Sequence, residues 1–482
     1  MKSIVILGGG EAGFYTALGL ERELHGQART TLVDIRSHMV YQPFLAEVAS
    51  GSIEPRHIQV PFHQHLRKTE IVCARVMGIS SAEKIVHLEN MDGDKWDLPY
   101  DILVVTLGGV VKTFPTPGIA EHAIGLKSVE EAVHIRNKII TNFNRVSSMY
   151  PDNPNRKRLL TFVVVGGGFS GIEVFAEMHD LAQNLLQFYP NVNESELEFH
   201  LIEAADRIMP EMPRERSAWV VQQMEERGAH VHLSTRVVSA VDGVVRTSEG
   251  KAYETEVIVW TAGQRANPVL QNSDLPLDSR GRLRCRTDLR VEGDDGIVKD
   301  VWGAGDACNV PDLSGDGLPD GSCAPTAQHA MRQAHLLVRN IIADLNGRTL
   351  LEYRHANAGM VAGLGMGLGV FTDGSKQRGI NGFVAWMFHR AYHGLAVPTV
   401  ERKVRVVSDW FRAFVVGRDF TATSEFAHPR ALFEEYAAPM RPEEKPVPQT
   451  EAASRTTVGA ADLDADAEAA SDDEPAQVDK AS

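Results

Sequence analysis

The sequence has little cysteine, no long apolar run and no excess of positive charge. Its 482 residues include four cysteines, Cys73, Cys285, Cys308 and Cys323, and no two of them have the C-x-x-C spacing of a redox pair or a metal site. We therefore expect reduced thiols, no disulfide framework and no bound metal. The formal net charge of -15 argues against a nucleic-acid partner.

No run of about 20 apolar residues occurs, so we predict no membrane-spanning helix. A strand pattern begins directly after Met1 and Lys2, and no signal-peptide pattern precedes it. Hydrophobic residues make up 43% of the chain and charged residues 23%, values typical of a globular protein with a large core. At 482 residues, two to four domains are expected.

Glycine, by contrast, is placed in a repeated pattern. Residues 3–7 form a buried-strand pattern, Gly8, Gly10 and Gly13 follow in G-x-G-x-x-G spacing, and residues 14–23 have the pattern of a helix. This order is the dinucleotide fingerprint. The first glycine makes the turn, the second admits the pyrophosphate, and the third lets the helix pack closely on the strand.

The same pattern returns later in the chain. Residues 159–165 form a strand pattern, Gly166, Gly168 and Gly171 repeat the spacing, and residues 172–188 have the pattern of a helix. Two fingerprints are far more specific than one. We therefore predict two bound dinucleotides.

An acidic residue ends the strand that follows each fingerprint. Asp34 follows residues 30–33, and Glu203 follows residues 197–202. A carboxylate at this position accepts a hydrogen bond from a ribose 2′-hydroxyl and repels a 2′-phosphate. The second site therefore favours NADH over NADPH, while Arg207 keeps NADPH open as the alternative.

Other segments give the organisation of the chain. Residues 38–52 are predicted to be a loop, which either lines a cofactor pocket or simply packs. Residues 101–107 form a buried strand, and residues 128–149 form a helix opened by a capping box. The polar, proline-bearing residues 151–158 indicate a linker and a domain boundary.

Two later strands end in residues that suit a cofactor. Residues 252–260 are followed by Gly263, and residues 301–306 end in a Gly-Ala-Gly-Asp run. Its last residue, Asp306, can bind the ribityl chain of a flavin. A helix then begins near Ala327, and its N-terminal dipole would stabilise an anionic reduced flavin.

The motifs GGGEAG, GGGFSGIEVFAE, VWGAGDA and PTAQHAMRQ, in this order, resemble those of the two-dinucleotide-binding flavoproteins. QPFL, the PTAQ helix start and GFVAW resemble the type II NADH dehydrogenases, or NADH:quinone oxidoreductases, in particular. The resemblance covers residues 3–419. It implies an α/β fold with two Rossmann-like domains, in which an NADH domain is inserted into a FAD domain split in sequence, and a C-terminal membrane-associating helical segment.

The expected domain bounds follow from this resemblance where it applies, and from composition for the acidic tail. They are 1–118 and 285–346 for the FAD domain, 119–157 for a connecting helix and linker, 158–284 for the NADH domain, 347–425 for an amphipathic membrane-binding region and 440–482 for a disordered acidic tail.

The resemblance also implies which residues bind the cofactors FAD and NADH. Those expected at FAD are Gly8, Gly10, Glu11, Ala12, Gly13, Asp34, Gln42, Gly108, Asp306, Ala327 and Gln328. Those expected at NADH are Gly166, Gly168, Phe169, Ser170, Gly171, Glu173, Glu203 and Gly263. Glu177, near the nicotinamide and flavin, and Gln328, beside the quinone pocket, are the expected catalytic residues. The alternative for Glu177 is a solvated helix position.

Some residues depart from the family pattern. His329, Met331 and Arg332 stand where apolar residues or glutamine are usual, and residues 359–369 are richer in glycine. These departures leave the type of quinone open. Cys308 and Cys323 do not fit the flavin-flanking cysteines of sulfide:quinone oxidoreductases, so we expect them to be core residues.

Residues 376–418 combine aromatic side chains with positive charge. Two helical stripes are expected on either side of Pro398, one formed by Phe383, Trp386, Met387 and Arg390 and the other by Val407, Trp410, Phe411 and Phe414. The cations are Lys376, Arg378, Arg390, Arg402, Lys403, Arg405, Arg412 and Arg418. Such helices suit an anionic membrane surface. The alternative is packing on the core or on a sister subunit.

The sequence thus predicts a peripheral, non-proton-pumping NADH:quinone oxidoreductase at the cytoplasmic face of the cell membrane. Its partner is a membrane quinone, and a homodimer is compatible with the sequence. One alternative is a related FAD-dependent NAD(P)H oxidoreductase with a soluble acceptor. Another is an NADH-binding redox-sensing flavoprotein that docks through the acidic residues 441–482.

Overall fold

The computed structural model describes residues 1–315, 317–355, 359–374 and 378–423. They belong to one compact unit, Met1–Ala427. The expected acidic tail, in residues 440–482, and Lys376 lie outside the described residues.

The first large sheet has β1 near its centre, in the order β21-β22-β9-β1-β2-β5. β1 pairs in parallel with β2 and β9, and β22 pairs in parallel with β9. The strands are β1 (Lys2–Leu7), β2 (Ala28–Asp34), β5 (Glu70–Cys73), β9 (Ile102–Val105), β21 (Arg290–Gly293) and β22 (Gly296–Gly303). The central strands are buried and apolar, as expected for a parallel sheet covered on both faces.

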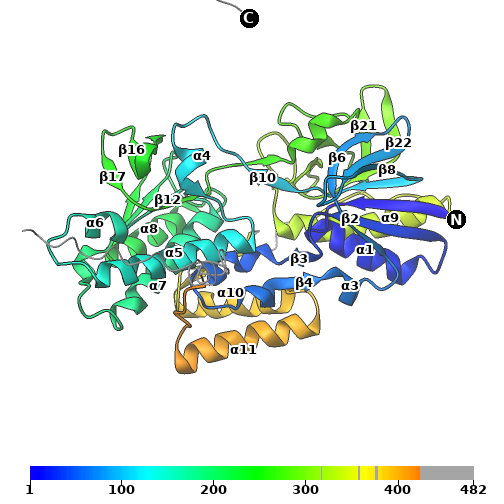
Figure 1. Cartoon of the computed structure of the whole chain (residues 1–482). Helices are drawn as coiled ribbons and strands as arrows, with labels where there is room; N and C mark the ends of the chain where they lie inside the picture. The colour runs from blue at the N-terminus through cyan, green and yellow to red at the C-terminus, as the bar shows by residue number, and fades with distance from the viewer. Residues whose placement is uncertain (316, 356–358, 375–377, 424–482) are drawn as a thin grey trace, which may run out of the picture. The chain divides into compact units, whose positions relative to one another are not determined.

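Helices α1 (Glu11–Glu23) and α9 (Ala327–Leu345) pack against each other beside this sheet (Figure 1). A Cβ on Gly19 would lie 2.6 Å from Cγ2 of Val338, so only glycine permits this approach. One turn earlier, the rings of Tyr15 and His335 lie 5.8 Å apart. The two helices therefore run in the same direction, and their N-termini lie at the same end.

The second large sheet is entirely parallel, in the order β11-β18-β12-β13-β14. Its strands are β11 (Ala123–Ile124), β12 (Thr161–Val165), β13 (Glu198–Ile202), β14 (His230–His232) and β18 (Val257–Trp260). Its main helices are α5 (Val129–Ser147), α7 (Phe169–Leu186) and α8 (Arg214–Glu226). The α/β dinucleotide-binding fold and the capping box of Ser128 and Glu131 are confirmed.

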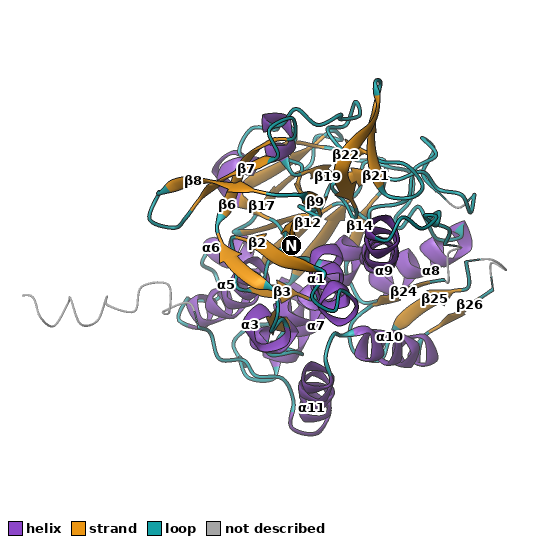
Figure 2. Ribbon diagram, turned by 90° about the vertical axis from the view of Figure 1, so that its right-hand side faces the viewer, coloured by secondary structure: helices purple, strands orange, loops and turns teal. Residues whose placement is uncertain are grey.

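Smaller elements complete the unit (Figure 2). β6 (Arg75–Ser80), β7 (Ile85–Glu89) and β8 (Lys95–Pro99) form a meander, and β15 (Val237–Ser239), β16 (Val244–Thr247) and β17 (Ala252–Glu254) form another. β24 (Met360–Gly363), β25 (Gly369–Thr372) and β26 (Gly379–Asn381) lead into α10 (Phe383–Ala396) and α11 (Val400–Val416). Among the described residues, no helix is long and apolar enough to cross a bilayer.

The remaining elements are short. They are β3 (His38–Val40), η1 (Gln42–Phe44), α2 (Leu45–Ala49), η2 (Pro55–Ile58), β4 (Gln59–Pro61), α3 (Phe62–His65), β10 (Gly109–Val111), α4 (Ile119–His122), α6 (Asn155–Leu160), η3 (Glu194–Glu196), η4 (Val241–Gly243), β19 (Gln264–Ala266), η5 (Pro268–Asn272), β20 (Leu283–Arg284) and β23 (Cys308–Asn309).

Three local predictions were wrong. The expected loop at residues 38–52 contains β3, η1 and the buried helix α2. The single strand expected at residues 252–260 is two strands in different sheets, because Thr255 breaks the run by accepting a hydrogen bond from the N–H of Val257. The linker expected at residues 151–158 contains the start of helix α6.

Arg156 explains why α6 forms in a polar segment. Its guanidinium is 4% exposed and makes a bidentate ion pair with Glu196. It also donates to the carbonyls of Val146, at 3.0 Å, and Asn191, at 2.9 Å. Arg156 thus ties α5, α6 and the loop before β13 together.

We expect Arg156→Leu to destabilise the chain by about 3–5 kcal/mol, because it leaves Glu196 half-buried without its partner. Arg156 lowers the pKa of Glu196, so the pair stabilises the fold above the usual carboxyl pKa and loses this effect as the pH falls through the lowered pKa. Urea unfolding against pH measures both effects. In the control Arg214→Leu, which breaks the exposed pair with Asp206, the loss should stay below about 1 kcal/mol. Equal losses in the two variants would contradict this account.

Candidate functional site

The two fingerprints fold into the same turn. Gly8 has a φ of +93° and donates its N–H to the carbonyl of Val33 at 2.8 Å. Gly166 has a φ of +109° and donates its N–H to the carbonyl of Ile202 at 2.9 Å. Only glycine adopts this left-handed conformation without strain. The turn therefore requires glycine at both positions.

The other glycines divide into two roles. A Cβ on Gly13 would lie 1.8 Å from the carbonyl oxygen of Gly8, and a Cβ on Gly171 would lie 1.9 Å from that of Gly166. These two glycines let α1 and α7 begin directly against the turn. A Cβ on Gly10 or Gly168 would meet nothing within 4 Å. Both cradles therefore have the open space, beside a helix N-terminus, that a pyrophosphate needs.

The two acidic residues hold the turns in place. Oδ2 of Asp34 accepts from the N–H of Gly9 at 2.6 Å, and Oε2 of Glu203 accepts from the N–H of Gly167 at 2.5 Å. A carboxylate oxygen can accept more than one hydrogen bond, so both acids can still bind a ribose hydroxyl.

A matched pair of threonines, which sequence reasoning missed, fastens each cradle. The hydroxyl of Thr106 lies 2.9 Å from the carbonyl oxygens of Leu7 and Gly8. The hydroxyl of Thr261 lies 3.0 Å from that of Val165 and 3.1 Å from that of Gly166. The signal in the sequence was a T-x-G run at the end of two buried strands, which ends in Gly108 in one copy and Gly263 in the other.

The N-termini of α1 and α9 converge on Gly305. A Cβ on this glycine would lie 3.4 Å from that of Ala12 and 3.7 Å from that of Ala330. The neighbouring Asp306 accepts from Nε2 of Gln264 at 2.6 Å, and Lys127 donates to Oε1 of the same glutamine at 2.6 Å. Gln264 lies in β19, and Lys127 lies just before α5. Gln264 therefore connects Asp306, beside the first cradle, to the start of α5, which covers the second sheet.

Glu11 is the first residue of α1, and its Oε1 is buried with no hydrogen-bond partner among the described residues. Burial and the nearby Asp306 raise the pKa of Glu11 to about 8. Its carboxyl group therefore carries a proton at neutral pH, so it can donate a hydrogen bond. An orphaned donor at a helix N-terminus fits a bound dinucleotide better than an empty turn does.

Gln328 and His329 lie at the start of α9, which begins at Ala327 as predicted. Oε1 of Gln328 lies 3.1 Å from Nε2 of His355, and Nδ1 of His329 lies 2.8 Å from the hydroxyl of Tyr353. Burial lowers the pKa of His329, so the imidazole is neutral at pH 7. Gln328 thus belongs to a polar cluster with histidine and tyrosine side chains.

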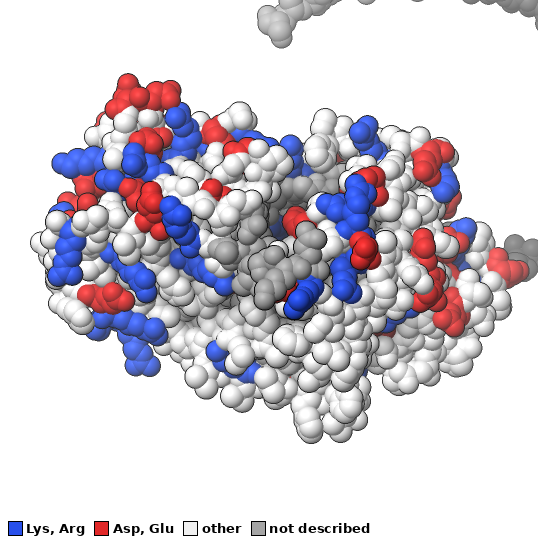
Figure 3. All heavy atoms as spheres, turned by 180° about the vertical axis from the view of Figure 1, so that it is seen from behind, with Lys and Arg blue, Asp and Glu red and all other residues white. Residues whose placement is uncertain are grey.

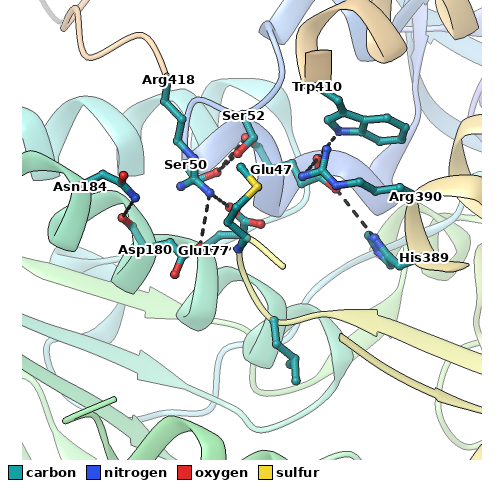
Figure 4. Close-up of polar contacts among 12 residues, drawn as sticks. Glu47, Ser50, Ser52, Glu177, Asp180, Asn184, His389, Arg390, Trp410 and Arg418 are labelled. Carbon is teal, nitrogen blue, oxygen red and sulfur yellow. Dashed lines mark hydrogen bonds and ion pairs between the residues drawn. The ribbon is translucent and has the colours of Figure 1, made fainter. Parts of the chain in front are cut away.

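Glu177 lies in a buried ion cluster, and the alternative of a solvated position is wrong. It is 4% exposed, and its Oε2 lies 3.2 Å from Nη2 of Arg418, which also lies 3.5 Å from Oδ2 of Asp180 (Figure 4). Burial raises the pKa of Glu177, and Arg418 opposes this effect in part. The cluster therefore has a carboxyl group that can gain or release a proton.

A second buried group joins α2, α7, α10 and α11. Oε2 of Glu47 accepts from the indole N–H of Trp410 at 2.6 Å (Figure 4). The guanidinium of Arg390 lies over the rings of Trp386 and Trp410, 4.3 and 4.7 Å from their centroids. Nε2 of His389 lies 3.3 Å from Oε1 of Glu173. Burial alone would lower the pKa of His389, but Glu173 and Glu47 outweigh it and raise this pKa.

These clusters correct the expected basic face of the C-terminal helices. Arg390, Arg402 and Arg418 are buried, and Arg402 donates to the carbonyl of Arg56 at 2.8 Å. Sequence reasoning missed that the acids on α2 and α7 require cations from the end of the chain. The hydrophobic context of Glu47, in LAEVA, and the buried helix α7 were the available signals.

The remaining predicted site residues have the positions given next, and their roles stay predictions. Phe169 and Ser170 begin α7, Gly108 and Gly263 have positive φ, and Gln42 is exposed in η1. Cys285, Cys308 and Cys323 are buried free thiols, and the described residues contain no cluster that could hold a metal ion.

Comparison with known proteins gives consistent matches. Residues 2–334 match the family described as pyridine nucleotide-disulphide oxidoreductase. A type II NADH:quinone oxidoreductase of Staphylococcus epidermidis is 30% identical over 77% of this chain and 89% of its own length. The corresponding protein of Mycobacterium tuberculosis is 28% identical over 90% of this chain and 93% of its own length. NDH2 of Plasmodium falciparum, solved with NADH, shares the fold with a TM-score of 0.77 at 18% identity, covering 87% of this chain and 99% of that one.

Alanine substitutions should have different effects at glycines where a Cβ meets nothing and at glycines where it would overlap the backbone. We expect Gly10→Ala and Gly168→Ala to keep the wild-type melting temperature, because the added methyl group meets no protein atom. Each should lose affinity for one dinucleotide only, Gly10→Ala at the first cradle and Gly168→Ala at the second. Equilibrium dialysis and thermal unfolding measure the two properties.

The matched controls are Gly13→Ala and Gly171→Ala, whose methyl groups would overlap a carbonyl oxygen. These variants should melt at lower temperature, since the turn and helix must separate. Loss of both dinucleotides in Gly168→Ala would contradict two independent cradles.

Proposed function

This chain belongs to the pyridine nucleotide-disulphide oxidoreductases and, within them, to the type II NADH:quinone oxidoreductases, and we propose that it oxidises NADH and reduces a quinone. Bound FAD supplies the chemistry, because a flavin accepts a hydride from NADH and passes two electrons to a quinone. We propose that this reaction does not pump protons, in keeping with the type II NADH:quinone oxidoreductases that the chain matches.

The observation that carries this proposal is the pair of complete cradles on two sheets of one unit. The first cradle suits FAD because α1 and α9 begin at the same place, beside Gly305 and Asp306. The second suits NADH because the carboxylate of Glu203 lies at its ribose position, while Arg207, the cation that left NADPH open, donates to the backbone carbonyls of Met212 and Pro210. Glu11 would donate a hydrogen bond to FAD, while Asp306 would accept one from its ribityl chain.

We assign catalytic roles to two residues. Burial raises the pKa of the Glu177 carboxyl and Arg418, 3.2 Å away, opposes this shift, so we propose that Glu177 exchanges a proton during the reaction. Gln328 orients the quinone through its amide, which already lies beside His355 and Tyr392. Burial lowers the pKa of His329, and a neutral imidazole suits a site that binds an uncharged quinone.

An absorbance experiment without oxygen tests the proposed function. The purified chain, loaded with FAD, should be bleached by NADH faster than by NADPH, and a short-chain quinone should restore the colour. Glu203→Gln should reduce the preference for NADH, because the carboxylate no longer repels a 2′-phosphate. A protein that binds no flavin, or whose colour only a soluble protein or oxygen restores, would refute the proposal.

We further propose that α11 attaches the chain to the cytoplasmic face of the membrane. One face of α11 exposes apolar side chains, with Phe411 exposed to 67% and Phe414 to 78%, while Val406 on another face is buried. Val400, Val404 and Val407 continue the exposed face. Figure 3 is turned about the vertical axis from Figure 1, so α11, the lowest helix in Figure 1, is also the lowest part of Figure 3. This part is white, which means that it is nearly free of charged residues on this side. A lipid-soluble quinone would then reach the enzyme from the bilayer. A homodimer stays a prediction.

Phe411→Glu combined with Phe414→Glu should abolish binding to phosphatidylcholine vesicles, because burying each phenyl ring contributes about 2 kcal/mol. NADH oxidation with a water-soluble acceptor should be unchanged. Vesicle flotation and steady-state kinetics measure the two effects. Val238→Glu with Val241→Glu, at exposed valines of β15 and η4, is the matched control and should still float. Flotation of the phenylalanine variant would refute attachment through α11.

A further inference from the structure

A cavity of about 770 Å³ lies between α1, α9 and the turn that joins α10 to α11. Tyr15 links the three elements, because its ring packs on His335 of α9 and its hydroxyl lies 3.5 Å from the carbonyl of Ala396. The cavity is large enough for a small organic ligand. None of the predicted FAD, NADH or catalytic residues lines it.

The cavity is lined by three cations and a single acid. Arg22 on α1, Arg339 on α9 and Lys403 on α11 lie around it, and Glu23 is the acid. Among the described residues, neither Arg22 nor Arg339 makes an ion pair or a side-chain hydrogen bond. Lys403 donates to the carbonyl of Leu395 at 2.6 Å, so its charge is held at the cavity without a carboxylate partner.

The close approach of Gly19 to Val338 sets the position of the two arginines. Both residues of this contact line the cavity. Arg22 follows Gly19 by nearly one helical turn, and Arg339 follows Val338 directly. Both arginines therefore lie next to the contact between α1 and α9. Burial and the charges of Arg339 and Arg332 lower the pKa of His335 between them. The cavity is therefore a place of surplus positive potential, which an anion would neutralise.

The other side of the cavity is apolar. Leu395, exposed to 74%, and Val400, exposed to 77%, stand at its edge, with Val397 and Pro398 between them. Val400 is also the first residue of the exposed α11 face. The cavity thus has cations on α1 and α9, and its apolar edge continues into the surface that we propose to enter the membrane.

From this arrangement we propose that the cavity binds one anionic phospholipid, with its phosphate on Arg22 and Arg339 and an acyl chain along Leu395 and Val400. The proposal rests on membrane attachment through α11. A quinone has no charge to pair with two arginines, and a free phosphate has no apolar part that could pack against Leu395 and Val400. The lipid satisfies both halves of the site. Arg22 and Arg339 would thereby supply the cationic contacts to an anionic membrane that the buried Arg390 and Arg402 cannot supply.

The test uses the full chain and short-chain phospholipids below their micelle concentration. By calorimetry, short-chain phosphatidylglycerol should bind with one-to-one stoichiometry, and phosphatidylcholine and inorganic phosphate should bind at least tenfold more weakly. Arg22→Gln with Arg339→Gln should weaken phosphatidylglycerol binding by about 25-fold, because each cation near an anionic lipid contributes about a factor of five. Arg236→Gln with Arg246→Gln, at two exposed arginines outside the cavity, should bind like the wild type.

Three outcomes would overturn the lipid site. They are equal affinity for the two lipids, phosphate binding as tightly as the lipid, or unchanged affinity in the Arg22 and Arg339 variant. Flotation separates this failure from that of membrane attachment. If the chain floats equally with phosphatidylcholine and phosphatidylglycerol vesicles, attachment stands and the lipid site fails. If it floats with neither, attachment fails as well.

Discussion

A helix can begin directly against the end of a strand only where no side chain intervenes, and the whole arrangement depends on this contact. Gly13 and Gly171 each bring a helix N-terminus onto the carbonyl of the first glycine of their turn, closer than any Cβ could come. The dipole and the free N–H groups of the helix then face the cradle. The acids Asp34 and Glu203 and the threonines Thr106 and Thr261 hold the backbone in this position. One contact, used twice, thus fixes both cradles.

Buried charge is the second constraint, and it joins distant parts of the chain. The acids Glu47, Glu173, Glu177 and Asp180 lie on α2 and α7, while Arg390, His389 and Arg418 come from α10 and the segment after α11. A buried carboxylate without a cation costs several kcal/mol, so the acids and cations require one another. The C-terminal helices are therefore fixed to the second cradle by electrostatics as well as by apolar packing.

The sequence predicted the parts of this structure that depend on local pattern. Strand, turn and helix at both fingerprints, the capping box at Ser128 and the helix break near Pro398 were all predicted, because glycine spacing, capping and proline act within a few residues. It did not predict α6 or the burial of Arg390, Arg402 and Arg418. An arginine in a basic stretch has the same local pattern whether it faces solvent or an acid more than 200 residues away. The cavity between α1 and α9 depends on a contact between Gly19 and Val338, which no local pattern reveals.

Arg418 is among the last of the described residues, yet its partners Glu177 and Asp180 lie near the middle of the chain. During synthesis, domains fold from the N-terminus as they emerge. Asp180 also pairs with Arg227, which follows it by 47 residues, at 2.9 Å. A ribosome-bound chain that has completed α7 must therefore keep the carboxyl group of Glu177 solvated or protonated until some 240 further residues have been translated. The second cradle reaches its final electrostatic state only after Arg418 has been translated.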